Sequence, residues 1–156
     1  MGIGLLLAAF FGGCKKAEPV TSLDTLTLTV TGMRANVDEY EFVKTGKGVK
    51  YTHYSGDWEY NDKVKREDCV EAEIDGDEAF YQALLKVLTD CRLTAWDGFD
   101  KAAKYVLDGY MFSLKASVNG GKTVSAKGSN AYPSGYREFR EVLSHLDANG
   151  TFPEGK

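Results

Sequence analysis

The spacing of apolar residues changes along this chain, and the change restricts the folds that it can adopt. From Leu23 to Thr31 the sequence reads LDTLTLTVT, so apolar and polar residues alternate. A period of two with β-branched residues is typical of a strand that buries one face. Beyond residue 76 the period becomes three to four, which is typical of an amphipathic helix. The positions that carry this second period are Phe80, Ala83, Leu84, Val87, Leu88 and Cys91.

Five strands are expected before this helix. Their segments are 23–31, 37–44, 49–54, one that begins at Trp58 and one that ends near Ile74. The connections between them are short and contain Gly, Asp and Asn, so neighbouring strands are expected to pair antiparallel.

We expect the first helix to run from about Asp77 to Cys91. Asp75 and Glu78 are spaced as in a capping box, with Asp in place of Ser or Thr. The connector 94–107 follows this helix. Its apolar residues have no clear period, and it is long enough to contain a helical turn.

Two strands and a second helix are expected in the last third of the chain. The strands are 110–118 and 122–130, and Asn119-Gly120-Gly121 between them is a strong hairpin signal because Gly and Asn accept a positive φ. Pro133 and Ser134 introduce the last helix, which Asn149-Gly150 can end.

This order predicts an α+β fold with two layers. We expect a mostly antiparallel sheet of about six to seven strands, with both helices packed on one face. The domain should span residues 23–150, with 151–156 as a tail. The other face of the sheet is predicted to be solvated or to face a ligand, and it would present Thr25, Thr27, Thr29, Ser113, Ser117, Thr123, Ser125 and Lys127.

Composition and charge exclude some classes of protein. The chain has 156 residues, of which 43% are hydrophobic and 27% charged, an ordinary globular composition. Its formal net charge is −4, and no run of Lys or Arg exceeds two residues. A nucleic-acid partner is therefore not expected, because such proteins usually carry a basic stripe.

The N-terminal segment has the pattern of an export signal. Residues 2–13 (GIGLLLAAFFGG) carry no charge, and the run is shorter than the ~20 residues that span a bilayer. It has the length of the apolar region of a signal peptide. Cys14 follows Gly12-Gly13, and Lys15-Lys16 come next.

Together, these residues resemble the lipobox of bacterial lipoproteins. The resemblance implies that residues 1–13 are a signal peptide, and that Cys14 receives a diacylglycerol on sulfur and a fatty acid such as palmitate on its amine. It implies a membrane partner through the lipid anchor and a place in the cell envelope, at the outer membrane if the cell is Gram-negative. Residues 14–22 would then be the lipidated cysteine and a polar tether.

The two remaining cysteines allow two interpretations. Cys69 and Cys91 are an even number in an oxidising compartment, which favours a disulfide. However, Cys91 lies on the apolar face of its helix, whereas Cys69 shares a strand face with Glu71 and Glu73. Two separate thiols are the alternative.

The sequence contains no recognised catalytic or metal-binding motif. There are two histidines, His53 and His145, and neither has a second ligand at metal-site spacing. We therefore expect no metal, no cofactor and no assignable catalytic residue. A small periplasmic or surface hydrolase stays as the alternative, and it would need a cleft that holds one histidine beside Asp or Glu.

Aromatic residues are the remaining functional signal. Tyr and Trp beside Asp and Asn are used by sugar- and peptide-binding surfaces, although packing in the core and rim of a small sheet is the more common role of such residues. The candidate ligand-binding residues are Tyr54, Trp58, Trp96 and Tyr132, and a glycan site would require Trp58 and Trp96 to be exposed and coplanar.

A short motif marks the junction between the last strand and the last helix. Gly128, Asn130, Tyr132 and Pro133 form the pattern G-x-N-x-Y-P, which resembles the ending of uncharacterised α+β domains from gut bacteria. Asn130 and Pro133 suit structural roles in the bend. The predicted function is thus a lipid-anchored envelope protein that binds a protein or an envelope glycan without catalysis.

Overall fold

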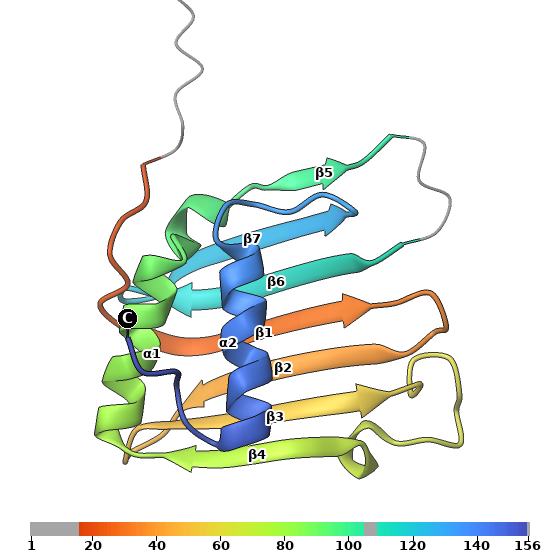
Figure 1. Ribbon diagram of the computed structural model, residues 1–156, viewed down its shortest axis with the longest axis horizontal. Helices are drawn as coiled ribbons and strands as arrows, with labels where there is room; N and C mark the ends of the chain where they lie inside the picture. Colours follow the sequence, from red (N-terminus) through yellow and green to blue (C-terminus); the bar gives the residue numbers. More distant parts are fainter. Residues whose placement is uncertain (1–15, 105–108, 156) are drawn as a thin grey trace, which may run out of the picture.

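One sheet carries every strand of the domain. The computed structural model describes residues 16–104 and 109–155, and the predicted signal peptide and Cys14 lie outside them. The strand order is β4-β3-β2-β1-β6-β7-β5, and all neighbours are antiparallel except β5, which is parallel to β7 (Figure 1). The strands are β1 (Leu23–Thr31), β2 (Val37–Lys44), β3 (Val49–Gly56), β4 (Val70–Gly76), β5 (Asp100–Ala102), β6 (Met111–Val118) and β7 (Lys122–Ser129).

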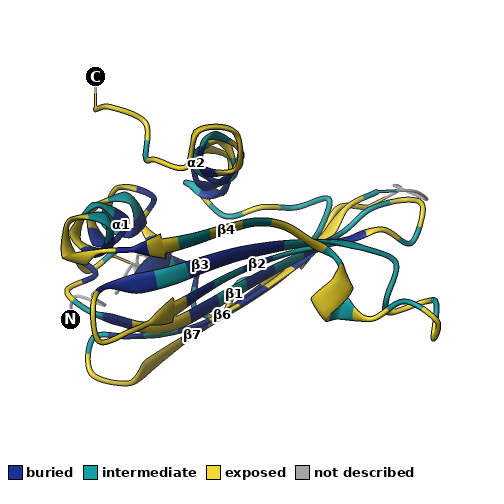
Figure 2. Ribbon diagram, turned by 90° about the horizontal axis from the view of Figure 1, so that it is seen from below, coloured by how far each residue is buried: buried dark blue, intermediate teal, exposed yellow. Residues whose placement is uncertain are grey.

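Two helices cover one face of this sheet, as predicted. They are α1 (Glu78–Asp90) and α2 (Tyr136–Asn149), and both lie on the same side in Figure 2. The cap of α1 is Asp77, whose carboxylate accepts a hydrogen bond from the Phe80 backbone N–H at 2.9 Å, so Asp75 does not cap the helix. No helix within the described residues is long and apolar enough to cross a membrane.

The core lies between the helices and the apolar face of the sheet. Alternation from Thr25 to Thr31 sends Leu26, Leu28 and Val30 inward, where they are buried, whereas a register shift between Leu23 and Thr25 interrupts the alternation expected at the start of β1. The helices contribute buried leucines and one phenylalanine, namely Leu84, Leu88, Phe139, Leu143 and Leu146. The threonine and serine positions of β1, β6 and β7 point to the opposite, uncovered face, which confirms the predicted polar side.

The prediction of a strand that begins at Trp58 is wrong. Residues 57–69 form a loop with a 3-10 turn, η1 (Arg66–Asp68), because consecutive tight turns interrupt any extended run. Arg66 fastens this loop to the uncovered face through ion pairs with Glu39 and Glu41, and its guanidinium lies 3.8 Å from the centre of the Tyr54 ring. The seventh strand is instead β5, which follows a second 3-10 turn, η2 (Leu93–Trp96).

The possible disulfide between Cys69 and Cys91 is not formed. Cys69 and Cys91 are free thiols. Cys69 precedes β4, whereas Cys91 follows the last residue of α1, and Figure 1 shows that these points lie toward opposite ends of the sheet. Separate thiols, the second interpretation of the sequence, describe the structure.

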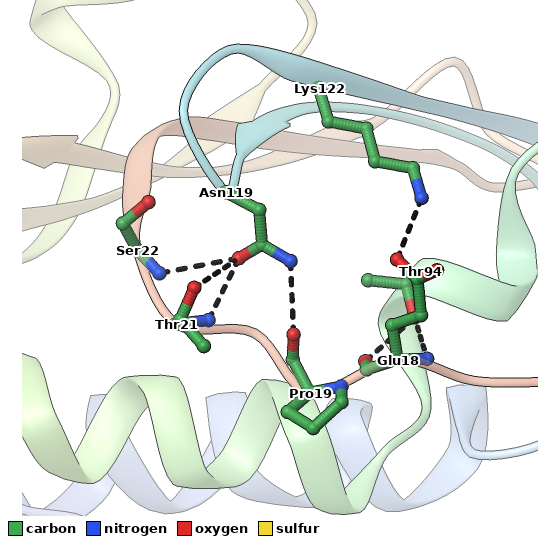
Figure 3. A network of polar contacts seen from close by, with 7 residues as sticks. All are labelled: Glu18, Pro19, Thr21, Ser22, Thr94, Asn119 and Lys122. Atoms are coloured by element: carbon green, nitrogen blue, oxygen red, sulfur yellow. Dashed lines mark hydrogen bonds and ion pairs between the residues drawn. The ribbon is translucent and has the colours of Figure 1, made fainter.

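The predicted tether is shorter than expected. Glu18 to Ser22 are hydrogen-bonded to the domain rather than suspended before it (Figure 3). Val20 is 4% exposed and belongs to the core. The folded unit therefore begins near Glu18, about five residues before the predicted boundary at residue 23.

Candidate functional site

A groove lies between α2 and the far ends of the first two strands. Its volume is about 540 Å³. Val30 near the end of β1 and Asp38 near the start of β2 line one side, and α2 lines the other. The remaining lining residues are Tyr110, Tyr132, Tyr136, Arg137, Arg140, Glu141 and Ser144. Aromatic rings beside a few polar groups in a concavity of this size are typical of ligand sites.

A stack of aromatic rings forms one wall. Tyr132 and Tyr136 are 4.7 Å apart and nearly parallel, with an interplanar angle of 17°, and Phe112 lies 4.7 Å from Tyr136. Tyr136 is buried, but Tyr132 is 42% exposed and Tyr110 is 55% exposed. Large exposed rings that are held by neighbours offer contact area to a ligand at a small entropic cost.

The G-x-N-x-Y-P motif builds this wall. Asn130 has a φ of +50°, its backbone N–H donates to the Tyr110 carbonyl at 3.0 Å, and its side-chain oxygen accepts from the Tyr110 N–H at 3.1 Å. A side chain at Gly128 would collide with the Ala131 carbonyl and the Phe112 ring. Pro133 follows Tyr132 and keeps it out of the helical region. The motif thus joins two exposed tyrosines that are far apart in sequence.

A cluster of charged and aromatic groups lies beneath the groove. The register of β2 and β3 places Tyr40 opposite His53, and their rings stack at 4.2 Å. His53 Nε2 lies 3.0 Å from Asp38 Oδ1, and Nδ1 lies 2.9 Å from Asp147 Oδ2, without the alignment of a hydrogen bond. The Tyr51 hydroxyl donates to Asp147 Oδ1 at 2.7 Å. The cluster therefore links the last turn of α2 to β2 and β3.

Arg140 joins this cluster to the groove. Its guanidinium lies 5.2 Å from the centre of the Tyr40 ring and donates to the Tyr40 hydroxyl at 3.4 Å. Burial raises the pKa of Tyr40 to about 12. The hydrogen bond to His53 is the main reason that the pKa of Asp38 lies below its ordinary value. Arg140 and Asp38 thus place opposite charges on the two sides of the groove.

This arrangement suits binding better than nucleophilic catalysis. Both nitrogens of His53 face carboxylates, and the ring is 8% exposed. No hydrogen bond joins His53 to a serine or cysteine among the residues that the structure describes. Within the same residues, no group of three or more His, Cys, Asp or Glu side chains is arranged to hold a metal ion.

The predicted aromatic residues do not form one site. Trp96 is 1% exposed and its Nε1 donates to the Ser134 carbonyl at 2.8 Å, so it belongs to the core and cannot offer a sugar-binding face. Trp58 lies in the 57–69 loop, and Tyr54 packs under Arg66 on the uncovered face. The coplanar pair of tryptophans is therefore absent, and of the four candidates only Tyr132 lines the groove.

Most residues of the groove and cluster were not among the candidates from the sequence. Tyr110, Asp38, Arg140 and Asp147 are brought together by the sheet and by α2. One signal was present, because Tyr136, Arg140 and Ser144 are four residues apart and share a helix face. His145, the other histidine, contributes no lining to the groove.

A second hollow of about 450 Å³ lies on the uncovered face, over β1, β6, β7 and β5. Its lining includes the small hydroxyls Thr29 and Ser113, together with Lys127, whose amine lies 3.5 Å from the Asp100 carboxylate. Among the described residues, its lining includes Phe112 but no tyrosine, so we regard the groove, with its exposed tyrosines, as the candidate site.

Comparisons with known proteins do not assign a family. No protein-family model matches the sequence, and no similar chain was found among curated proteins or among solved structures. The class that the structure shows is therefore that of an α+β domain, and the tyrosine-lined groove is its candidate site.

Proposed function

We propose that this protein is a lipid-anchored protein of the bacterial cell envelope whose domain binds an envelope glycan in the tyrosine groove without transforming it. The observation that carries the proposal is the exposure of Tyr110 and Tyr132 in a groove that also holds Arg140 and Asp38. An aromatic ring offers area to the apolar face of a sugar, and charged groups beside it bond to hydroxyls.

A glycan suits the groove better than a folded protein partner. Of the large hydrophobic residues that are exposed in the described part of the chain, only Tyr110 and Tyr132 line the groove, where they lie beside charged side chains, and a docking site for a folded protein would need a larger continuous patch. A volume of about 540 Å³ is in the range of sites for small ligands. His53 lies beside Asp38 and Asp147, as the hydrolase alternative would require, but it is 8% exposed and does not line the groove, which supports a non-catalytic role.

The anchor is supported by the sequence at Cys14. Metabolic labelling with an alkynyl fatty acid should mark the natural chain and not the C14S variant. Equal labelling of both would contradict lipidation at this residue.

Binding is tested with purified protein in detergent and with defined probes. The probes are muropeptides, lipopolysaccharide core oligosaccharides and capsular oligosaccharides, together with stem peptides that carry no sugar. We expect a sugar-containing probe to bind and Y132A to weaken it about tenfold, or ~1.4 kcal/mol. The control is Y60A, because Tyr60 is 58% exposed but does not line the groove. Binding of the sugar-free peptides alone, or equal affinity of Y132A and the natural protein, would overturn the proposal.

A further inference from the structure

The chain that enters the domain is held across one end of the sheet. We call residues 18–22 the strap. The Glu18 backbone N–H donates to Thr94 Oγ1 at 2.7 Å, and the same hydroxyl donates to the Glu18 carbonyl at 2.8 Å. The Val20 N–H donates to Thr89 Oγ1 at 2.9 Å. Two threonines, one in α1 and one in η2, thus bind the strap backbone.

Asn119 holds the strap from the other side. Its side-chain oxygen accepts from the N–H groups of Thr21 at 2.8 Å and Ser22 at 3.3 Å, and its amide donates to the Pro19 carbonyl at 2.9 Å (Figure 3). Lys122 adds an ion pair with Glu18 at 2.9 Å. One side chain in the β6–β7 turn therefore binds three residues of the strap.

The strap shortens the distance between Cys14 and the folded domain. From Cys14 to Glu18 there are four Cα steps, which span at most about 14 Å when extended. If residues 18–22 were free, the nine steps to Leu23 would span about 31 Å. Docking of the strap thus removes more than half of the reach that the tether would otherwise have.

The strap and the groove lie at opposite ends of the strands. β1 begins beside the strap at Leu23 and runs toward Val30, which lines the groove. The β6–β7 turn at Asn119 and the β2–β3 turn at residues 45–48 are at the strap end, whereas Tyr110 and Asp38 are at the groove end (Figure 1).

We propose that the strap seats the domain on the lipid bilayer by its strap end, so that the groove opens away from the membrane. The inference rests on the lipid anchor of the proposed function. We infer that the strap end faces the bilayer surface, because at most about 14 Å of chain separates Cys14, which carries the lipid, from Glu18. A short, fixed attachment restricts both the height and the tilt of the domain, and a flexible tether would restrict neither.

The test measures the distance of each end from the membrane. The lipidated protein, with C69S and C91A substitutions, is reconstituted in vesicles of phosphatidylcholine and phosphatidylglycerol that contain an acceptor dye on a headgroup. A donor dye is placed at K47C, in the β2–β3 turn, or at K63C, in the 57–69 loop at the opposite end. We expect at least twofold higher energy-transfer efficiency from position 47 than from position 63.

Loosening of the strap should reduce this difference. T94V deletes the hydroxyl bonds with little change in volume, and N119G deletes the side chain at a position whose φ of +51° suits glycine. In the double variant the difference in transfer efficiency should fall by at least half. The control is T123A, an exposed position in β7 whose side chain makes no hydrogen bond to the strap within the part of the chain that the structure describes. Circular dichroism establishes whether each variant is folded. If the double variant does not fold, the measurement is made with T94V alone.

The outcomes separate the two proposals. Equal transfer from positions 47 and 63 in vesicles that carry the natural protein would overturn the orientation and leave the anchor in place. An unchanged difference in a folded strap-release variant would overturn the role of the strap. If the natural protein does not float with the vesicles any more than C14S does, the anchor fails, and the orientation fails with it. Glycan affinity, measured in detergent, is independent of all three results.

Discussion

Asp147, in the last turn of α2, lies 2.9 Å from Nδ1 of His53 on β3, and the other nitrogen of this ring lies 3.0 Å from Asp38. A buried imidazole thus separates two carboxylates that come from the sheet and from the helix. Because Arg140 of the same helix lines the groove, the position of the groove wall depends on this contact.

Removal of the imidazole should destabilise the domain. In H53A the carboxylates of Asp38 and Asp147 would face each other without the imidazole between them. We expect the free energy of unfolding to fall by about 2 kcal/mol, below the 3–5 kcal/mol typical of a fully buried pair, since both carboxylates are partly exposed. Urea denaturation measures the change. H145A, outside the cluster, should stay within about 0.5 kcal/mol, and similar losses in the two variants would contradict the role of His53.

The contribution of Asp38 to the free energy of unfolding should depend on pH. Its pKa in the folded protein is lowered from 3.8, chiefly by the hydrogen bond to His53. A carboxyl whose folded pKa is depressed adds stability above its unfolded pKa and loses that contribution as the pH falls through the folded value. The difference in unfolding free energy between the natural protein and D38N should therefore be largest near neutral pH and shrink below pH 3.8. A difference that is constant from pH 7 to pH 3 would show that the charge of Asp38 makes no such contribution.

Two substitutions at Asn130 should differ in a defined way. N130G removes the side-chain bond to Tyr110 but keeps a residue that accepts a φ of +50°, and it should cost about 1 kcal/mol. N130A also forces a β-carbon into the left-handed region, which adds about 1 kcal/mol. Thermal unfolding should therefore rank the natural protein above N130G and N130G above N130A. An N130A protein as stable as N130G would argue against the strain at this position.

The two thiols should react at different rates. Burial raises the pKa of Cys91 to about 11, and its side chain is 5% exposed. Cys69 is more accessible and belongs to the segment just before β4. At pH 8, Ellman's reagent should modify Cys69 in the folded protein and Cys91 only after unfolding. Mass spectrometry of the untreated protein should find both as thiols; a mass two units lower would instead indicate the disulfide.

Local patterns explain why most of the secondary structure was predictable. The alternation in residues 23–31 and the three- to four-residue spacing in 80–91 depend only on neighbours in the chain, and the structure places β1 and α1 there. The strand expected at Trp58 failed because tight turns on either side leave too few extended residues. β5 was missed because its three residues are extended only through pairing with β7.

The site was much less predictable than the fold. Tyr132 and Trp96 were both aromatic candidates, but Tyr132 lines the groove, whereas Trp96 is enclosed by α2 and its neighbours. Tyr and Trp carry the same signal in a sequence whether they pack in a core or line a groove. Whether such a residue is buried in the core or lines a groove depends on the helix or strand that covers it.

The sequence by itself determined the alternation of β1, the amphipathic helices, the hairpin at Asn119 and the two-layer arrangement, because periodicity and turn chemistry act over a few residues. Only the tertiary structure decided that Asn119 also binds the strap, about 100 residues earlier in the chain, and that Asp38, His53 and Asp147 meet beneath a tyrosine-lined groove. Those contacts join distant segments, and they exist only after the sheet has set the strand register and α2 has packed across it.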